Sequence, residues 1–406
     1  MNYKNWQKKK IIASQAHQEE IFNQLNNQNY IERSGKKIIL EDNKKYTEFV
    51  SCSYLGLDQD YRLLNCVNTN ISSVGFIFPS SRSRIKYKGL DDLQDLLNQI
   101  FEANTVVFST THLAHLGLIP LIASGEMPSV TLAPNGCVFL LDHAVHASIQ
   151  INRGLMQQFG QVEILDLHDL TQLEAKLKII SNNNQTPLLF TDSICSMGGM
   201  LPLENLMQLT NKYSGYLYLD DAHGMSVYGK HGAGYVMHIF NHKLPDRLIL
   251  TTSLGKGFGT CGGLVVLKSK EAANFIKMYS STYMFSGTLA NPLISACLES
   301  SKIHLSSEIT FLQKQLSENV ALFDTLIKDK TKVINFNCNT PIRGIKIGDE
   351  FDAIKAGLHL KESGYLGVVA TYPIREKGKA IIRLLICSNH TKEDIQQICT
   401  LINLTF

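Results

Sequence analysis

A lysine flanked by two glycines follows an apolar segment near the middle of the chain, and this turn limits the possible folds more than any other feature. Residues 247–250 read Arg-Leu-Ile-Leu, and Lys256 follows with a glycine on each side. An apolar run that ends in glycines is typical of a strand that stops at a sharp turn. A second apolar run ends in polar residues, beginning with Asp220. We therefore expect two strands, each with a polar group at its carboxyl end.

One chemistry uses both of these polar groups. A lysine amine forms a Schiff base with an aldehyde cofactor, and a carboxylate keeps the pyridine nitrogen of that cofactor protonated. The cofactor implied by Lys256 and Asp220 is pyridoxal phosphate. Each group alone has a simpler interpretation, because a glycine-flanked lysine is usually a solvated turn and the pair Asp220 and Asp221 is usually a cap or a turn. Their combination favours the catalytic interpretation.

Four motifs around these two residues resemble those of a known enzyme family. They are Asp-Asp-Ala-His-Gly at 220–224, Gly-Lys-His-Gly-Ala-Gly at 229–234, Ser-Leu-Gly-Lys-Gly-Phe-Gly at 253–259 and Gly-Gly at 262–263. The combination resembles the α-oxoamine synthases, a family of fold-type I pyridoxal phosphate enzymes. The resemblance implies an α/β fold like that of aspartate aminotransferase, with a large mixed-sheet domain and a small C-terminal α/β domain.

The resemblance also implies roles around the cofactor ring. Lys256 would carry the cofactor and later move the substrate α-proton, and Asp220 would pair with the pyridinium nitrogen. His223 would contact the phenolic oxygen, to which Ser196 would donate a hydrogen bond. His146, which ends an Asp-x-x-x-His motif, would lie flat against the ring.

The phosphate of the cofactor is expected at the start of a helix. Residues 105–108 form a short apolar strand, and hydroxyl side chains then lead into an apolar helix at 113–122. Free amides at a helix N-terminus attract an anion, and in the family this junction holds the phosphate. The candidates for this site are Thr110, Thr111, His112, Ser253 and Thr288. Thr288 would contact the phosphate of a neighbouring subunit, with a simple helix N-cap as the alternative.

Two histidines near this helix raise the alternative of a metal site. His112 and His115 lie one helical turn apart, but no third ligand is evident in the sequence. Histidines on a helix face are more often structural, so we expect no metal and a structural role for His115. We interpret His143 as a histidine of a surface loop.

The amino-acid site departs most from the family. Arg383 would clamp the substrate carboxylate with two parallel hydrogen bonds, a geometry that lysine does not offer. Cys52 stands where the family has an asparagine that helps to hold the carboxylate. Thr371 stands where some members have a second arginine, and Arg375 is near that position but out of register.

Length and composition limit the remaining possibilities. The 406 residues suit two domains, and we expect an N-terminal helical segment at 1–45, a large cofactor domain at 46–290 and a small C-terminal domain at 291–406. A net charge of +3 is too small to indicate a nucleic-acid partner, and we expect none. The nine cysteines, with no CxxC pair, indicate reduced thiols in a cytoplasm. Because no run of about 18 apolar residues occurs, we expect no membrane span.

The function that we expect is decarboxylative condensation of an α-amino acid with an acyl-CoA, catalysed by a homodimer whose active site lies at the interface. Arg82 and Arg84 are the nearest basic candidates for coenzyme A, although a solvated loop is an equally good interpretation of them. One rival function is another pyridoxal phosphate reaction, such as aldol cleavage or transamination. The other is a non-catalytic subunit that supports an active partner.

Overall fold

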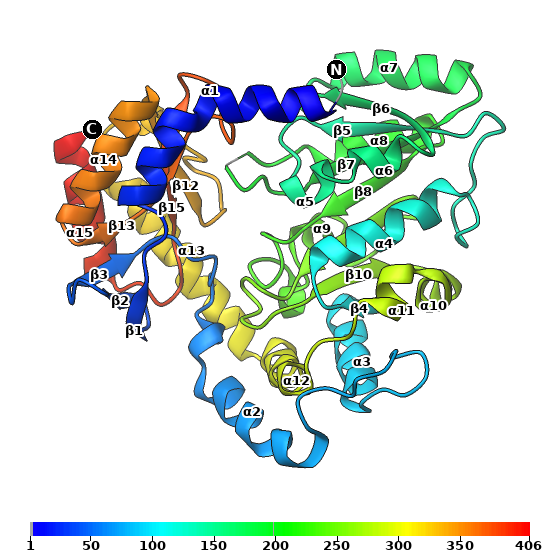
Figure 1. Ribbon diagram of the computed structural model, residues 1–406, viewed down its shortest axis with the longest axis horizontal. Helices are drawn as coiled ribbons and strands as arrows, with labels where there is room; N and C mark the ends of the chain where they lie inside the picture. Colours follow the sequence, from blue (N-terminus) through cyan, green and yellow to red (C-terminus); the bar gives the residue numbers. More distant parts are fainter. Residues whose placement is uncertain (1–2, 198) are drawn as a thin grey trace. The chain divides into compact units, whose positions relative to one another are not determined.

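The computed structural model describes residues 3–197 and 199–406 and, within these ranges, the side chains outside 3–7 and 68–70. The chain folds into two compact units (Figure 1). The large unit comprises Leu57–Cys195 and Met200–Phe311. The small unit comprises the chain up to Gly56, Ser196–Gly199 and Leu312–Phe406.

The large unit is built on a mixed sheet. Its strands, in their order across the sheet, are β4 (Asn104–Phe108), β10 (Gly263–Leu267), β9 (Leu248–Ser253), β8 (Tyr216–Asp220), β7 (Thr186–Asp192), β5 (Cys137–Asp142) and β6 (Gly160–Leu165). β10 is antiparallel to both of its neighbours, and the other neighbouring strands run parallel. The mixed sheet and the fold-type I α/β architecture expected from the sequence are confirmed.

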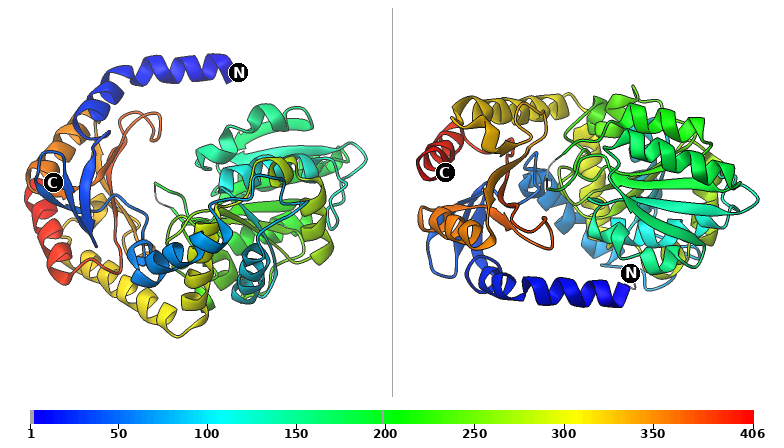
Figure 2. Two further views of the ribbon diagram at one scale, coloured as in Figure 1. Left: turned by 60° about the horizontal axis from the view of Figure 1, so that its bottom comes forward. Right: turned by 90° about the horizontal axis from the view of Figure 1, so that it is seen from above.

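Helices cover both faces of this sheet (Figure 2). Val138 and Leu140 of β5 point into one apolar core, while Phe139 and Leu141 point into the other. This alternation follows from the two-residue period of a strand. It explains why the central strands are continuous apolar runs, since both of their faces are buried.

Eleven α-helices belong to the described part of the large unit, and their lengths differ widely. They are α2 (Tyr61–Val74), α3 (Gly89–Phe101), α4 (Thr111–Ala123), α5 (Ala147–Gln150), α6 (Arg153–Met156), α7 (Leu170–Asn182), α8 (Leu203–Lys212), α9 (Tyr235–Ile239), α10 (Lys270–Tyr279), α11 (Ser281–Phe285) and α12 (Asn291–Leu305). We expected α12 to open the C-terminal domain. It lies in the large unit instead, because it packs against α2 and α3.

Strand ends bring the polar residues together. In the parallel register Asp192 of β7 pairs with Asp220 of β8, and Asp220 pairs with Thr251 of β9. These residues therefore form one row across the carboxyl edge of the sheet. In open α/β sheets, ligands bind outside this edge.

The small unit contains two four-stranded sheets. One sheet holds β1 (Tyr30–Ser34), β2 (Lys37–Leu40), β3 (Lys45–Glu48) and β13 (Tyr365–Leu366), and the other holds β11 (Val333–Ile334), β12 (Ile342–Gly348), β15 (Ala380–Leu385) and β14 (Val368–Ala370). Its helices are α1 (Tyr3–Gln24), α14 (Glu350–Glu362) and α15 (Lys392–Thr405), and α13 (Glu308–Leu326) enters it from the large unit.

The N-terminal segment is only partly helical. α1 forms as expected and packs on α14, but residues 30–48 form strands rather than a continuation of the helical segment. Ile38, Leu40 and Tyr46 of these strands are buried in an apolar cluster of their own. Because β3 pairs in parallel with β13, the N-terminal residues belong to the same compact unit as the C-terminal ones.

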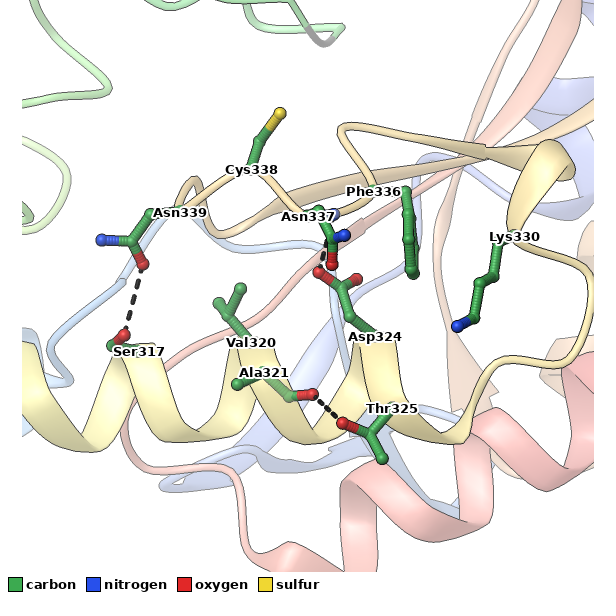
Figure 3. A pocket seen from close by; sticks show the side chains of 10 residues that line it. All are labelled: Ser317, Val320, Ala321, Asp324, Thr325, Lys330, Phe336, Asn337, Cys338 and Asn339. Atoms are coloured by element: carbon green, nitrogen blue, oxygen red, sulfur yellow. Dashed lines mark hydrogen bonds between the residues drawn. The ribbon is translucent and has the colours of Figure 1, made fainter.

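Asp324 lines a cavity of about 440 Å³ in the small unit (Figure 3), and its carboxylate also forms a buried ion pair. Arg343 is fully buried, and its Nε and Nη2 donate to the two carboxylate oxygens of Asp324 at 2.8 and 2.7 Å. The backbone N–H of Asn337 donates to the same carboxylate at 3.1 Å. Both oxygens of Asp324 are thus engaged, so the pair ties α13 to β12 and to the loop at 336–339.

Candidate active site

A cavity of about 200 Å³ opens at the carboxyl edge of the large sheet. It is lined by Thr111, His112, His146, Ser148, Asp192, Asp220, Ala222, His223, Ser253 and Lys256. Most of the residues predicted from the motifs therefore meet in one place. They arrive from the ends of β7, β8 and β9, the loop after β5 and the start of α4.

Lys256 lies on a tight turn after β9. Its Nζ is 2.9 Å from Nε2 of His223, and because the ammonium group only donates, that ring nitrogen accepts. Gly259 has a φ of 80°, and a Cβ there would lie 2.6 Å from Cβ of Leu57. A Cβ on Gly257 would lie 2.9 Å from the carbonyl oxygen of Met225. The glycines are therefore required for this path of the backbone, which presents the amine to the cavity.

Asp220 ends β8 as a buried carboxylate. Its Oδ1 accepts from the N–H of Ala222 at 3.0 Å, and its Oδ2 lies 3.2 Å from Nε2 of His115. Burial alone would raise the pKa of Asp220, but the hydrogen bond and charge of His115, with a contribution from Lys256, place the pKa below its ordinary value. The structure therefore holds Asp220 ionised, as a partner for a cationic ring requires.

His115 was not expected at the site. It is fully buried, and its two ring nitrogens contact Asp220 and the hydroxyl of Tyr218. The sequence contains one indication of this position. His115 is four residues after Thr111 on α4, so the two share a helix face, and Thr111 lines the cavity.

Asp192 also lines the cavity without having been predicted. Its Oδ1 accepts from the backbone N–H of His146 at 3.2 Å, while Nδ1 of the His146 ring lies 2.8 Å from Oγ of Ser148. Burial raises the pKa of Asp192 well above its ordinary value, and the charge of Asp220 adds to this. Of the two neighbouring carboxyl groups, Asp192 is therefore the one whose pKa is raised and Asp220 the one whose pKa is lowered.

The start of α4 follows the expected strand-to-helix junction. Oγ1 of Thr110 caps the helix by accepting from the N–H of Leu113 at 3.2 Å, so this side chain serves the helix rather than the cavity. Oγ1 of Thr111 donates to the carbonyl of Thr252 at 3.3 Å, and Nδ1 of His112 lies 3.1 Å from the carbonyl of Ser148.

Two hydroxyls near this junction lack partners among the residues that the structure describes. They are the buried Oγ of Ser109 and the buried Oγ1 of Thr288. The residue that caps α12 is Ala290, so the alternative that Thr288 caps this helix is wrong. Leu289 approaches Gly262 from the same side as the carbonyl of Phe108, which places the Thr288 segment beside the end of β4.

Ser253 contributes to the turn itself. Its Oγ accepts from the N–H of Gly255 at 3.1 Å while its residue lines the cavity beside Lys256. The residues present fit pyridoxal phosphate: an amine for its aldehyde, an ionised carboxylate for its ring nitrogen, and a helix N-terminus with the hydroxyls of Ser109 and Thr288 nearby for its phosphate.

Ser196 and Arg383 belong to the small unit, where they contact each other. Nη1 of Arg383 donates to the carbonyl of Ser196 at 3.0 Å, and Nε of Arg383 is buried without a partner among the described residues. Tyr54 lies nearby: burial and the Cys52 thiol raise its pKa well above the ordinary value, against an opposing effect of Arg383. Thr371 is fully buried and accepts from Gln18 at 2.9 Å.

Arg82 has a structural role that the sequence did not indicate. The interpretation of a solvated loop is wrong for this residue, because Arg82 is buried and donates to the carbonyls of Val107 and Gly287. Its guanidinium also lies over the ring of Tyr283. Arg84 is exposed, as a solvated loop requires.

Residues 64–402 match the family described as Aminotransferase class I and II. The chain belongs to this family, and it is a pyridoxal phosphate enzyme of fold type I. Within the family it is similar to 8-amino-7-oxononanoate synthases: the one from Thermosipho melanesiensis is 30% identical over 87% of this chain and 86% of its own length. The one from Petrotoga mobilis is 31% identical with the same coverage, 87% and 86%. The resemblance to α-oxoamine synthases is thus confirmed.

Solved structures show the same fold. Serine palmitoyltransferase from Sphingomonas wittichii superimposes with a TM-score of 0.84 and 20% identity, covering 97% of this chain and 96% of its own. An 8-amino-7-oxononanoate synthase from Francisella tularensis has a TM-score of 0.72 and 21% identity, covering 88% and 97%.

Proposed function

We propose that the protein condenses an acyl-CoA thioester with an α-amino acid and releases carbon dioxide and free coenzyme A, leaving an α-amino ketone. Bound pyridoxal phosphate supplies the aldehyde that takes up the amine of the amino acid and the cationic ring that holds the electrons freed at its α-carbon. The observation that carries the proposal is the meeting of Lys256, Asp220, His223 and His146 in one cavity of the large unit. The 8-amino-7-oxononanoate synthases similar to this chain support it.

Lys256 is proposed to hold the cofactor and then to move the α-proton of the substrate. Its amine donates a hydrogen bond to His223, which restricts the orientation of the amine. A proton-transfer group must be oriented within hydrogen-bond distance of the atom that it serves. The glycine turn and His223 together provide that orientation.

Asp220 is proposed to accept the hydrogen bond of the pyridinium nitrogen. It is ionised because of His115, and the N–H of Ala222 fixes its other oxygen. Each pKa unit by which this carboxylate favours the protonated ring is worth about 1.4 kcal/mol. Asp192 lies in the same cavity and supports the loop of His146 by accepting a hydrogen bond from its backbone N–H.

Arg383 is proposed to bind the carboxylate of the amino acid. Its buried Nε has no partner among the described residues, and a carboxylate satisfies such a nitrogen. Cys52 and Thr371 replace groups that assist this arginine elsewhere in the family. We therefore expect Arg383 to supply most of the recognition, and Ser196 to help orient it through its carbonyl.

The two rival functions have less support than the proposed condensation. Aldol cleavage or transamination would use the same cofactor site but no acyl-CoA, whereas the curated relatives are synthases. A supporting subunit without activity has no need for the contacts that join Lys256 to His223 and Asp220 to His115.

We further propose a homodimer in the cytoplasm. Large apolar side chains are exposed near the ends of α2 and α11, namely Phe76, Ile77, Phe78, Ile85 and Phe285. The side chain and N–H of Asn291 bind the carbonyls of Val74, Gly75 and Phe76, which fixes this segment beside the start of α12. A second copy that covers these side chains would also bring Thr288 to the cofactor phosphate of its partner. Among the described residues, no helix is both long and apolar enough to cross a bilayer.

A panel assay tests the function. The purified protein with pyridoxal phosphate is mixed with acyl-CoAs of increasing chain length and with individual amino acids, and free thiol is measured over time. We expect thiol release only when an amino acid is present, with one pair clearly preferred. Turnover of an amino acid in the absence of any acyl-CoA would support the rival reactions instead.

A further inference from the structure

A chain of three buried side chains lies behind the cavity. The hydroxyl of Tyr218 is 2.8 Å from Nδ1 of His115, and Nε2 of His115 is 3.2 Å from Oδ2 of Asp220. The three residues are at most 5% exposed. They come from β8 and α4, so the helix that begins at the cavity also supports the carboxylate that faces it.

The direction of the hydrogen bonds follows from the carboxylate. An ionised Asp220 only accepts, so Nε2 of His115 must carry a hydrogen and donate it. Nδ1 then either accepts from the hydroxyl of Tyr218 or donates to its oxygen, and a hydroxyl serves in both arrangements. His115 therefore has both ring nitrogens satisfied while it is buried, and its orientation is determined from two sides.

We infer that His115 is a positioning residue, which acts on the cofactor ring nitrogen through Asp220. By holding Oδ2 on one side, His115 keeps the carboxylate ionised and leaves the remaining lone pairs of Asp220 directed at the cavity. Tyr218 fixes the imidazole in turn. The inference rests on the proposed role of Asp220 as the partner of the ring nitrogen, and it adds two residues of this chain to that role.

Two substitutions separate the two contacts of the imidazole. In His115→Gln the side-chain amide nitrogen takes the place of Nε2 and still donates to Asp220. In His115→Asn the shorter amide takes the place of Nδ1 and contacts only Tyr218. Tyr218→Phe removes the hydroxyl and leaves the imidazole beside Asp220.

His304→Asn is the matched control for a buried histidine. His304 is fully buried in the same unit, and it binds Ser226 and the carbonyl of Ser300 instead of a carboxylate. If His115 only fills space, its replacement by Asn should resemble that of His304.

The measurement is the affinity of the cofactor-free full chain for two ligands. One is pyridoxal phosphate, and the other is its deaza analogue, in which a carbon replaces the ring nitrogen. The ratio of the two affinities reports the contact at the ring nitrogen alone, because the aldehyde and the phosphate are the same in both ligands. General loosening of the fold weakens both ligands equally and leaves the ratio unchanged.

We expect His115→Asn to lower this ratio at least about tenfold, the size of a lost hydrogen bond to a charged group. His115→Gln should keep most of the ratio, Tyr218→Phe should lower it by a smaller factor, and His304→Asn should leave it unchanged. Asp220→Asn tests the underlying assignment and should abolish most of the preference for pyridoxal phosphate.

The outcomes distinguish the two claims. A normal ratio in both His115 variants, with a lowered ratio in Asp220→Asn, overturns the role of His115 and leaves the role of Asp220 intact. A normal ratio in Asp220→Asn overturns both, because the ring nitrogen then has another partner.

Discussion

Three neighbouring carboxyl groups at the sheet edge differ in pKa because their contacts differ. Asp220 accepts from His115 and is ionised. Burial and the charge of Asp220 raise the pKa of Asp192 well above its ordinary value. Burial raises the pKa of Asp221 to about 7, although Ser193 and the N–H of Val236 donate to it. Separated pKa values of this kind allow neighbouring carboxyl groups of one site to take different roles.

Lys256→Ala should remove the covalent attachment of the cofactor. The wild-type protein should be yellow, and borohydride should fix the cofactor to a peptide that contains Lys256, because a Schiff base is reduced to a stable amine. The variant should still bind pyridoxal phosphate reversibly through its phosphate and ring contacts. Mass spectrometry after reduction makes the comparison, and a cofactor still fixed in the variant would contradict the assignment of Lys256.

Because His304 is buried, we expect the folded protein to lose stability in mild acid. Burial lowers the pKa of His304 from 6.5 to about 4. Between these two pH values His304 is therefore protonated in the unfolded chain and neutral in the folded chain. The contribution of neutral His304 to stability is present above pH 6.5 and is lost as the pH falls toward 4. At pH 5 this loss is about 2 kcal/mol. Urea unfolding at pH 7 and pH 5 should show a smaller drop in His304→Asn than in wild type, and equal drops would contradict the prediction.

Local sequence patterns predicted where the central strands lie better than they predicted which strands and helices belong to the same compact unit. β8 and β9 were placed correctly, because an apolar run ending in glycine or aspartate describes a central parallel strand. The strands at 30–48 were missed because they are short, and because the pairing of β3 with β13 joins residues far apart in the sequence. For the same reason α12 was assigned to the wrong unit.

The site shows the same limit. Lys256, Asp220 and His223 lie in recognisable motifs, and the structure brings them together. His115 of α4 contacts Asp220 on β8, and the pKa of Asp192 is raised by burial and by the charge of Asp220 on the adjacent strand. Neither effect is visible in a linear pattern. Thr110 lies at the start of the helix, as expected, but its hydroxyl caps the helix by accepting from the N–H of Leu113.

The ion pair of the small unit should be costly to break. Asp324→Ala leaves the fully buried guanidinium of Arg343 without its carboxylate, and such a loss costs about 3–5 kcal/mol. The control is Asp352→Ala on α14, whose ion pair with Lys355 is exposed and worth at most about 1 kcal/mol. Denaturant unfolding monitored by circular dichroism compares them, and similar midpoints for both variants would contradict a structural role of the buried pair.

At the scale of the whole molecule, the two units draw on different parts of the chain. The large unit is nearly continuous in sequence, whereas the small unit joins both ends of the chain with residues 196–199. Those four residues follow β7, so the strand that ends at Asp192 leads directly from the cofactor cavity to the segment that contacts Arg383.

The proposed dimer predicts a response to charge on its apolar surface. Phe78→Asp and Phe285→Asp place a carboxylate on side chains that the second copy would bury, and this should shift the protein from dimer to monomer. Ile374→Asp is the control, because Ile374 is also exposed but belongs to the small unit. Light scattering coupled to size exclusion measures the mass. A wild-type monomer, or dimers in both phenylalanine variants, would contradict the proposal.

The most direct test of the central claim is the stoichiometry of the reaction. An amino acid labelled in its carboxyl group is incubated with the preferred acyl-CoA, and labelled carbon dioxide and free thiol are counted together. We expect equal amounts of carbon dioxide and thiol in wild type. In Asp220→Asn we expect the rate to be lower by about a hundredfold, because the ring then loses the charge that keeps it protonated. Thiol without carbon dioxide, or full activity in Asp220→Asn, would contradict the central claim.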